Sequence, residues 1–132
     1  MWGWPFEDFG RHEFACRCRC GFDDIDLGLV TTLQALRESV ARPVVIISGC
    51  RCGEHNARVG GSRFSQHTKG RAADIHVRGL SSKQVMDRLR LLYLQYKAYV
   101  GYVYEVSPRS LHVDVRTPES SLVRGWRRFS KG

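Results

Sequence analysis

Apolar residues recur at three- and four-residue intervals in two segments of the chain, and each spacing predicts an amphipathic helix. The first helix can be capped by Asp26 and extends to about Ala41. Its apolar stripe comprises Leu29, Leu33, Leu36 and Val40. The second helix can be capped by Ser81 or Ser82 and extends to about Tyr96. Its stripe comprises Val85, Leu89, Leu92 and Tyr96.

Four shorter segments have the composition of β-strands, namely residues 44–48, 71–77, 99–106 and 111–116. The first is continuously apolar, which predicts a strand buried on both faces. The polar stretch at 49–70 is predicted to be a long loop with a functional role. Short turns join the strands, and helices and strands do not alternate regularly. We therefore expect an α+β fold with an antiparallel sheet and helices packed mainly on one face.

Length and composition limit the class of protein. The chain has 132 residues, which predicts a single domain over residues 1–132, and 42% of them are hydrophobic, which excludes a disordered chain. No apolar run approaches the ~18 residues of a membrane span. The first residues lack the pattern of a secretory signal, so we expect synthesis in the cytoplasm. We also expect an irregular segment at 1–21 and a tail at 117–132 that packs back through Trp126 and Phe129.

Charge and cysteine content leave several alternatives open. A formal net charge of +8 favours an anionic partner, which could be nucleic acid, a membrane surface or an acidic cell-wall polymer. The alternative is a basic surface that is only solvated. No nucleic-acid-binding motif is present, which weakens the first option. The five cysteines are Cys16, Cys18, Cys20, Cys50 and Cys52. Their C-x-C spacing is tighter than in most structural zinc sites, so buried thiols, one disulfide and a cysteine-only metal site all remain open.

Side chains that can bind a metal gather on two of the predicted strands. Asp74 and His76 share one face of their strand, and alternation places His112 and Asp114 together on one face of the last strand. His67 precedes the first of these strands. Two histidines and a carboxylate form a zinc ligand set, and a catalytic zinc keeps a fourth position for water, whose pKa it lowers to ~7. The helical H-E-x-x-H motif is absent, which excludes the common helix-based zinc peptidases as a template. Because His112 and Asp114 face away from the core, we expect the zinc site in a cleft on the sheet face opposite the helices.

Residues 65–74, SQHTKGRAAD, match the S-x-H-x-x-G-x-A-x-D motif of the M15 family of zinc D-Ala-D-Ala carboxypeptidases and related peptidoglycan peptidases. Residues 111–116, LHVDVR, resemble the strand that carries the third ligand in that family. The chain is most similar to short M15A-type proteins of bacteriophages and bacteria. It shares with them EFAC at 13–16, the SGxRCxEHN pattern at 48–56 and VGG at 59–61. The resemblance extends from about Phe9 to Trp126.

The resemblance implies that His67, Asp74 and His112 bind a single zinc ion per chain. It also implies that Arg51 binds the substrate or stabilises the oxyanion, a role suited to a rigid and permanently charged guanidinium. Ser65, beside the metal, is expected to hydrogen-bond the substrate or a ligand carboxylate. The alternatives are an ordering role in the loop for Arg51 and a role in the turn for Ser65.

The general base is where the sequence departs from its relatives. Many of them have Glu, Asp or His two or three residues before the last ligand, where this chain has Ser110 and Arg109. Asp114 is the first candidate, with orientation of a ligand histidine as an equal alternative. His76 is the second candidate by the same strand geometry, and Glu105 is the third.

These observations predict a zinc metallopeptidase that hydrolyses amide bonds next to D-amino acids in peptidoglycan stem peptides. It would be a D,D-carboxypeptidase or an endopeptidase, and a monomer. A phage lysin, virion-associated or released at lysis, would explain how a protein without a signal acts on the cell wall. Two alternatives stay open: a non-catalytic zinc domain that binds the cell wall or a partner protein, and a basic nucleic-acid binder.

Overall fold

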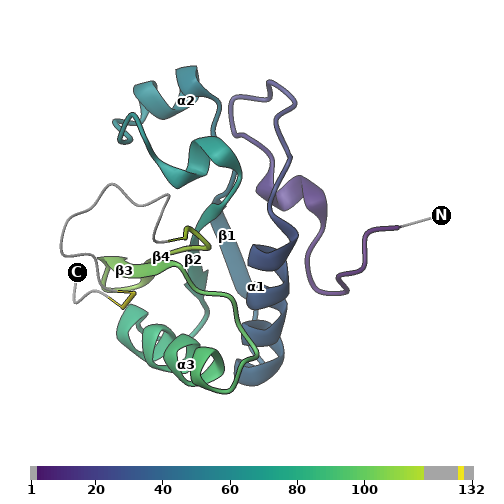
Figure 1. The fold of residues 1–132 in the computed structure, drawn as a ribbon, viewed down its shortest axis with the longest axis vertical. Helices are drawn as coiled ribbons and strands as arrows, with labels where there is room; N and C mark the ends of the chain where they lie inside the picture. The colour runs from purple at the N-terminus through teal and green to yellow at the C-terminus, as the bar shows by residue number, and fades with distance from the viewer. Residues whose placement is uncertain (1–2, 118–127, 130–132) are drawn as a thin grey trace.

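The computed structural model describes residues 3–117 and 128–129 of the chain. Three α-helices, two 3-10 helices and four strands appear in those residues (Figure 1). In chain order they are η1 (Arg11–Phe14), α1 (Leu27–Val40), β1 (Val44–Ser48), α2 (Gly53–Arg58), η2 (Gln66–Lys69), β2 (Ala72–Val77), α3 (Ser82–Leu94), β3 (Tyr102–Ser107) and β4 (Ser110–Asp114). They form a small single-domain α+β protein, which confirms the predicted fold class.

The four strands form one antiparallel sheet in the order β1-β2-β4-β3. The central strands β2 and β4 are far apart in sequence but hydrogen-bonded neighbours in space. Their register places Asp74 directly opposite His112. The condition on which the predicted metal site depends, that these two strands lie side by side, is therefore met.

The core lies between the sheet and the helices α1 and α3. Alternation along the central strands sends their apolar side chains to this side, where they pack with leucines of both helices. The fully or almost fully buried strand residues include Ala73, Ile75, Val77, Leu111 and Val113. Each large aliphatic side chain buried here contributes roughly 1.5–3 kcal/mol. The same alternation places Asp74, His112 and Asp114 on the opposite face of the sheet.

Both predicted long helices are present, with local signals at their ends. The Asp26 carboxylate accepts a hydrogen bond from the Leu29 N–H at 3.1 Å, which caps α1. Ser81 and Gln84 form a capping box at the start of α3. The prediction that this second helix reaches Tyr96 is wrong. The helix ends at Leu94, and Tyr96 adopts a positive φ of 60° with its side chain 97% exposed.

Two further expectations about local structure are corrected. β1 is an edge strand and is not buried on both faces: Val45 and Ile47 are 39% and 47% exposed, because α1 and α3 cover only one side of the sheet. The stretch at 49–70 is not a loop throughout, since it contains α2 and η2. These helices have six and four residues, which is too short for an apolar periodicity to reveal them.

The end of the described chain returns to the domain. The Phe129 ring packs edge-on against Tyr93, with ring centroids 6.0 Å apart, and its backbone forms a bridge with Val103. The other residue expected in this contact, Trp126, lies outside the described residues. Among the helices of the described ranges, none combines the length and the apolar character needed to cross a membrane.

Candidate metal centre

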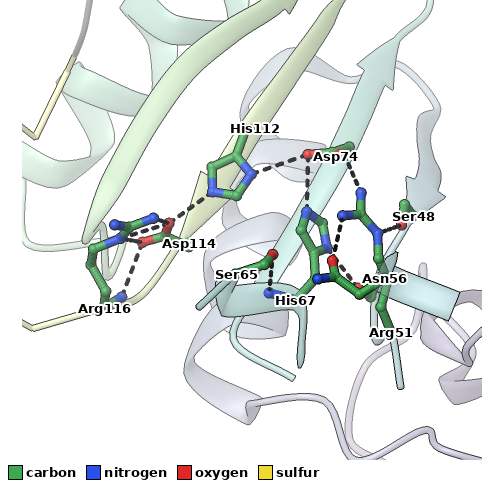
Figure 2. Close-up of polar contacts among 10 residues, drawn as sticks. Ser48, Arg51, Asn56, Ser65, His67, Asp74, His112, Asp114 and Arg116 are labelled. Carbon is green, nitrogen blue, oxygen red and sulfur yellow. Dashed lines mark hydrogen bonds and ion pairs between the residues drawn. The ribbon is translucent and has the colours of Figure 1, made fainter. Parts of the chain in front are cut away.

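Three elements bring the predicted ligands His67, Asp74 and His112 to one place. They come from η2, β2 and β4 respectively, and one ligand atom of each lies within 4.8 Å of the others. Figure 2 shows the two imidazole rings pointing at the Asp74 carboxylate from different sides. Both histidines are 2–3% exposed, so this convergence lies beneath the surface of the protein.

A single carboxylate oxygen is shared by the two rings. Asp74 Oδ1 lies 3.3 Å from His67 Nε2 and 3.1 Å from His112 Nδ1. Four ligands at ~2.0–2.1 Å around a tetrahedral zinc ion are separated from each other by about 3.3 Å. The two distances to Asp74 Oδ1 therefore match the separation of neighbouring ligands on a zinc ion.

The other nitrogen of each ring has a partner that fixes the ring's orientation. His67 Nδ1 donates to the Gly49 carbonyl at 2.7 Å, and His112 Nε2 donates to Asp114 Oδ2 at 2.7 Å. A carbonyl oxygen can only accept, so the His67 tautomer carries its proton on Nδ1 and directs the Nε2 lone pair at the site. Hydrogen bonds of this kind to the outer nitrogen are typical of metal-binding histidines.

The second oxygen of Asp74 is held by Arg51. The Arg51 guanidinium lies 3.2 Å from Asp74 Oδ2 and also donates to Ser48 Oγ and Asn56 Oδ1, at 3.1 and 3.2 Å. Asn56 in turn donates to the Ser62 carbonyl at 2.8 Å, a contact that orders the loop. Because Arg51 donates to Asp74 Oδ2, the other carboxylate oxygen, Oδ1, is the one that contacts the two histidines.

The electrostatics of the site follow from this close packing of opposite charges. Burial opposes ionisation of Asp74, but hydrogen bonds and charges from His112 and His67 outweigh it and hold the pKa of Asp74 well below its usual range. Burial likewise disfavours a charged His112, yet Asp114 and Asp74 raise the pKa of the imidazole. The site therefore holds an ionised carboxylate between two imidazoles, which are donor types that zinc accepts.

Local backbone geometry explains why the glycine of the motif is needed. The Ser65 hydroxyl accepts from the His67 N–H at 3.2 Å and caps η2. Gly70 ends η2 with a positive φ of 67°, and a Cβ there would overlap the Asp24 carbonyl. The Gly70 carbonyl accepts from the Asp26 N–H at 2.7 Å. This turn sets the spacing between His67 and the start of β2.

The candidates for the general base lie in three different environments. The Asp114 side chain is fully buried, and Arg116 pairs with its carboxylate at 2.7 Å in addition to His112. Glu105 accepts from Ser82 Oγ at 2.6 Å on the helix side of the sheet, which removes it from the candidates. His76 is on the site face, half-buried, and its Nδ1 lies 2.8 Å from the Arg109 carbonyl.

The sequence analysis missed an aromatic wall beside the site. The Tyr104 ring stacks on His112, with centroids 4.5 Å apart and planes at 16°. Burial, with the charges of Asp74, Tyr102 and Asp114, raises the pKa of Tyr104, so its phenol stays protonated at neutral pH. Alternation on β3 and the short turn to β4 were the available signals, because they place Tyr102 and Tyr104 on the face that carries His112.

The fold brings two histidines to the same carboxylate oxygen of one aspartate, and these three residues define a candidate mononuclear metal centre. The model of the family Peptidase M15 matches residues 7–114, which is most of the chain. The chain therefore belongs to peptidase family M15, a family of zinc peptidases, and is assigned as a metallopeptidase. A comparison with curated proteins returned no match.

Proposed function

We propose that this protein is a zinc-dependent peptidase that hydrolyses amide bonds next to D-amino acids in peptidoglycan stem peptides. The observation that carries the proposal is the convergence of His67, Asp74 and His112, in which one nitrogen of each imidazole lies 3.1–3.3 Å from Asp74 Oδ1. Membership of family M15 supports hydrolysis of a peptide. The choice of a D-amino acid substrate rests on the likeness of residues 65–74 and 111–116 to the carboxypeptidases of that family.

Residues around the three proposed zinc ligands are proposed to bind the substrate and stabilise the oxyanion. When bound, zinc would acidify a water molecule and polarise the scissile carbonyl. Arg51 anchors Asp74 through one nitrogen, and its permanent positive charge beside the ligands suits stabilisation of the oxyanion or binding of a substrate carboxylate. Ser65, whose hydroxyl is already the cap of η2, is proposed to hydrogen-bond the substrate as well.

The contacts favour different roles for Asp114 and His76. A base must take the proton of the attacking water and pass it to the leaving amine. Asp114 has no exposed surface and pairs with His112 and Arg116, so we assign it the role of positioning His112. His76 is proposed as the base, because donation from Nδ1 to the Arg109 carbonyl leaves Nε2 as the atom that can accept a proton.

The proposed setting is the bacterial cell wall. A net charge of +8 complements an anionic wall polymer and gives an attraction that salt would weaken. A lysin that is delivered by a phage or released at lysis would meet its substrate there. We propose that the protein acts as a monomer and that nucleic acid is not its partner.

Purified muropeptides of defined structure test this function. Mass spectrometry after incubation with the zinc-loaded protein should show hydrolysis at a D-amino acid. Loss of a terminal D-Ala would identify a carboxypeptidase, and cleavage within the stem or cross-link would identify an endopeptidase. The His12→Ala variant, changed at an exposed histidine outside the site, should match the wild type, whereas His67→Ala should be inactive.

The second candidate function is a non-catalytic zinc domain that binds the cell wall or a partner protein. It is favoured by the absence of an acidic residue or histidine at positions 109 and 110, where many relatives have the base. A zinc-replete protein that binds wall material but leaves every muropeptide intact would establish this function in place of the peptidase.

A further inference from the structure

A second group of metal-binding side chains lies outside the candidate metal centre. The thiols of Cys16, Cys18, Cys20 and Cys52 all lie within 4.8 Å of one another. The first three come from the N-terminal segment and the fourth from the residue that caps α2. In Figure 1 the purple N-terminal segment and the teal α2 region lie next to each other at one end of the molecule. We propose that these four thiols bind a structural zinc ion.

The sulfur positions fit a tetrahedral ion better than a disulfide. Cys18 Sγ lies 3.4 Å from Cys16 Sγ and 3.5 Å from Cys52 Sγ. Four sulfurs at ~2.3 Å from a zinc ion are about 3.8 Å apart, whereas a disulfide bond is about 2.05 Å long. All five cysteines are free thiols in the structure. Four soft thiolates without a histidine or a carboxylate select zinc among the common divalent ions.

The local fold explains how the tight C-x-C-x-C spacing can supply three ligands. The Cys16 N–H donates to the Phe22 carbonyl at 2.8 Å, and the Arg19 N–H donates to the Cys16 carbonyl at 3.0 Å. Arg19 and Gly21 have positive φ values of 65° and 96°. The segment therefore turns back on itself, so its thiols gather on one side although only single residues separate them.

Hydrogen bonds from the backbone support thiolates at two of these positions. The Cys52 N–H donates to Cys16 Sγ, and the His55 N–H donates to Cys52 Sγ, both at 3.4 Å. Such donors offset the negative charge of a tetrathiolate site and orient its ligands.

The fifth cysteine, Cys50, does not belong to the cluster of four thiols. Its side chain is 1% exposed and belongs to the hydrophobic core, and it is absent from the group of four. This thiol is two residues from the proposed ligand Cys52 but packs among apolar side chains of the core. It therefore provides a matched control for substitution of the other cysteines.

The proposed ion would connect the N-terminal segment to the loop that supports the metal centre. Cys52 follows Arg51, which holds Asp74. The same loop includes Gly49, whose carbonyl accepts from His67, and Cys50, whose N–H donates to the Phe14 carbonyl at 2.8 Å. A structural site of this kind contributes to folding directly, because its ligands are not assembled in the unfolded chain.

Metal content and cobalt absorption test the proposal independently of peptidase activity. The protein is purified with a non-thiol reductant, and zinc is counted per chain in the wild type, in His67→Ala/His112→Ala, and in Cys50→Ala. We expect two zinc ions in the wild type and in Cys50→Ala, and one in the histidine variant. Loading that variant with Co²⁺ should give the intense near-ultraviolet absorption of thiolate-to-cobalt charge transfer.

If the histidine variant does not fold, the wild type still tests the proposal. A thiolate band in the wild type can come only from the cysteine site, since the histidine and aspartate site contains no sulfur. Substituting Cys18→Ser and Cys52→Ser together should abolish this absorption. The proposal is overturned if Co²⁺ gives no thiolate band in the wild type, or if fewer than five free thiols are titrated after unfolding without reductant. A wild type with the thiolate band and only one zinc ion would instead contradict the peptidase centre and leave this site standing.

Discussion

Asp114 Oδ2 accepts a hydrogen bond from His112 Nε2 at 2.7 Å, and both residues lie on the same face of β4 (Figure 2). This contact determines which nitrogen of His112 is available to a metal. It directs Nδ1 toward Asp74 Oδ1, 3.1 Å away. In the proposed metal centre, the Asp114 carboxylate would orient the His112 imidazole as a ligand, and such a contact affects metal affinity more than proton transfer.

Asp114→Asn should therefore weaken zinc binding at the His67, Asp74 and His112 site by ~10–100-fold, because the neutral amide is a poorer acceptor for the His112 N–H. Competition with a chromophoric chelator measures this affinity. Glu105→Gln removes the same charge on the helix side of the sheet and should leave the affinity unchanged. Unchanged zinc affinity with lost turnover in Asp114→Asn would make Asp114 the base instead.

Arg51→Lys should lower kcat by about 10²–10³-fold when zinc is saturating, since an ammonium cannot reproduce the three contacts of the guanidinium or its rigid planar geometry. Steady-state kinetics on a muropeptide measures the change. Arg58→Lys, the same substitution at an exposed position of α2, serves as the control. A wild-type kcat in Arg51→Lys would show that Arg51 only orders the loop.

Tyr104→Phe should keep the stacking contact with His112 and the stability of the fold, whereas Tyr104→Ala should lower the free energy of unfolding by at least about 1 kcal/mol. Urea denaturation of the two variants measures the difference. Equal losses in both would mean that the phenol hydroxyl, and not the ring, makes the contribution.

Cys50 should make the stability of the protein depend on pH in the alkaline range. Burial, with the charges of Asp23 and Asp24, raises the pKa of the Cys50 thiol to about 12, while the thiol of the unfolded chain ionises near ~8.5. The folded state keeps a proton that the unfolded state releases, so the free energy of unfolding falls as pH rises through this interval. The loss attributable to this thiol reaches about 2 kcal/mol at pH 10.

Denaturation of the wild type and Cys50→Ala between pH 8 and pH 10 measures this effect, because all other titrating groups are common to both. The wild type should lose more stability than the variant over the range. Parallel pH dependences would show that the Cys50 thiol ionises normally in the folded protein.

The proposed ligand set could be selected from the sequence because it depends on short-range pattern. His67 and Asp74 lie in one ten-residue segment, and alternation on a strand places the third donor. What alternation could not supply is the pairing of β2 with β4, which puts Asp74 opposite His112. The family motif supplied the reason to expect that pairing before the fold was known.

Features that depend on tertiary contacts could not be predicted. The apolar run of β1 indicates a buried strand, but its position at the sheet edge is a property of the strand order. The Gly49 carbonyl that orients His67 carries no side-chain signal at all. The Cys50 N–H donates to the Phe14 carbonyl, and this tertiary contact helps to bring Cys52 to the three N-terminal thiols, which lie 32 to 36 residues earlier in the sequence.

Crystals of the zinc-loaded protein, with diffraction recorded on both sides of the zinc absorption edge, test the central claim most directly. An anomalous peak ~2.0–2.2 Å from His67 Nε2, Asp74 Oδ1 and His112 Nδ1 is the expected result. A zinc-loaded crystal without a peak among these three atoms, or with the two imidazoles turned away from Asp74, would contradict the account.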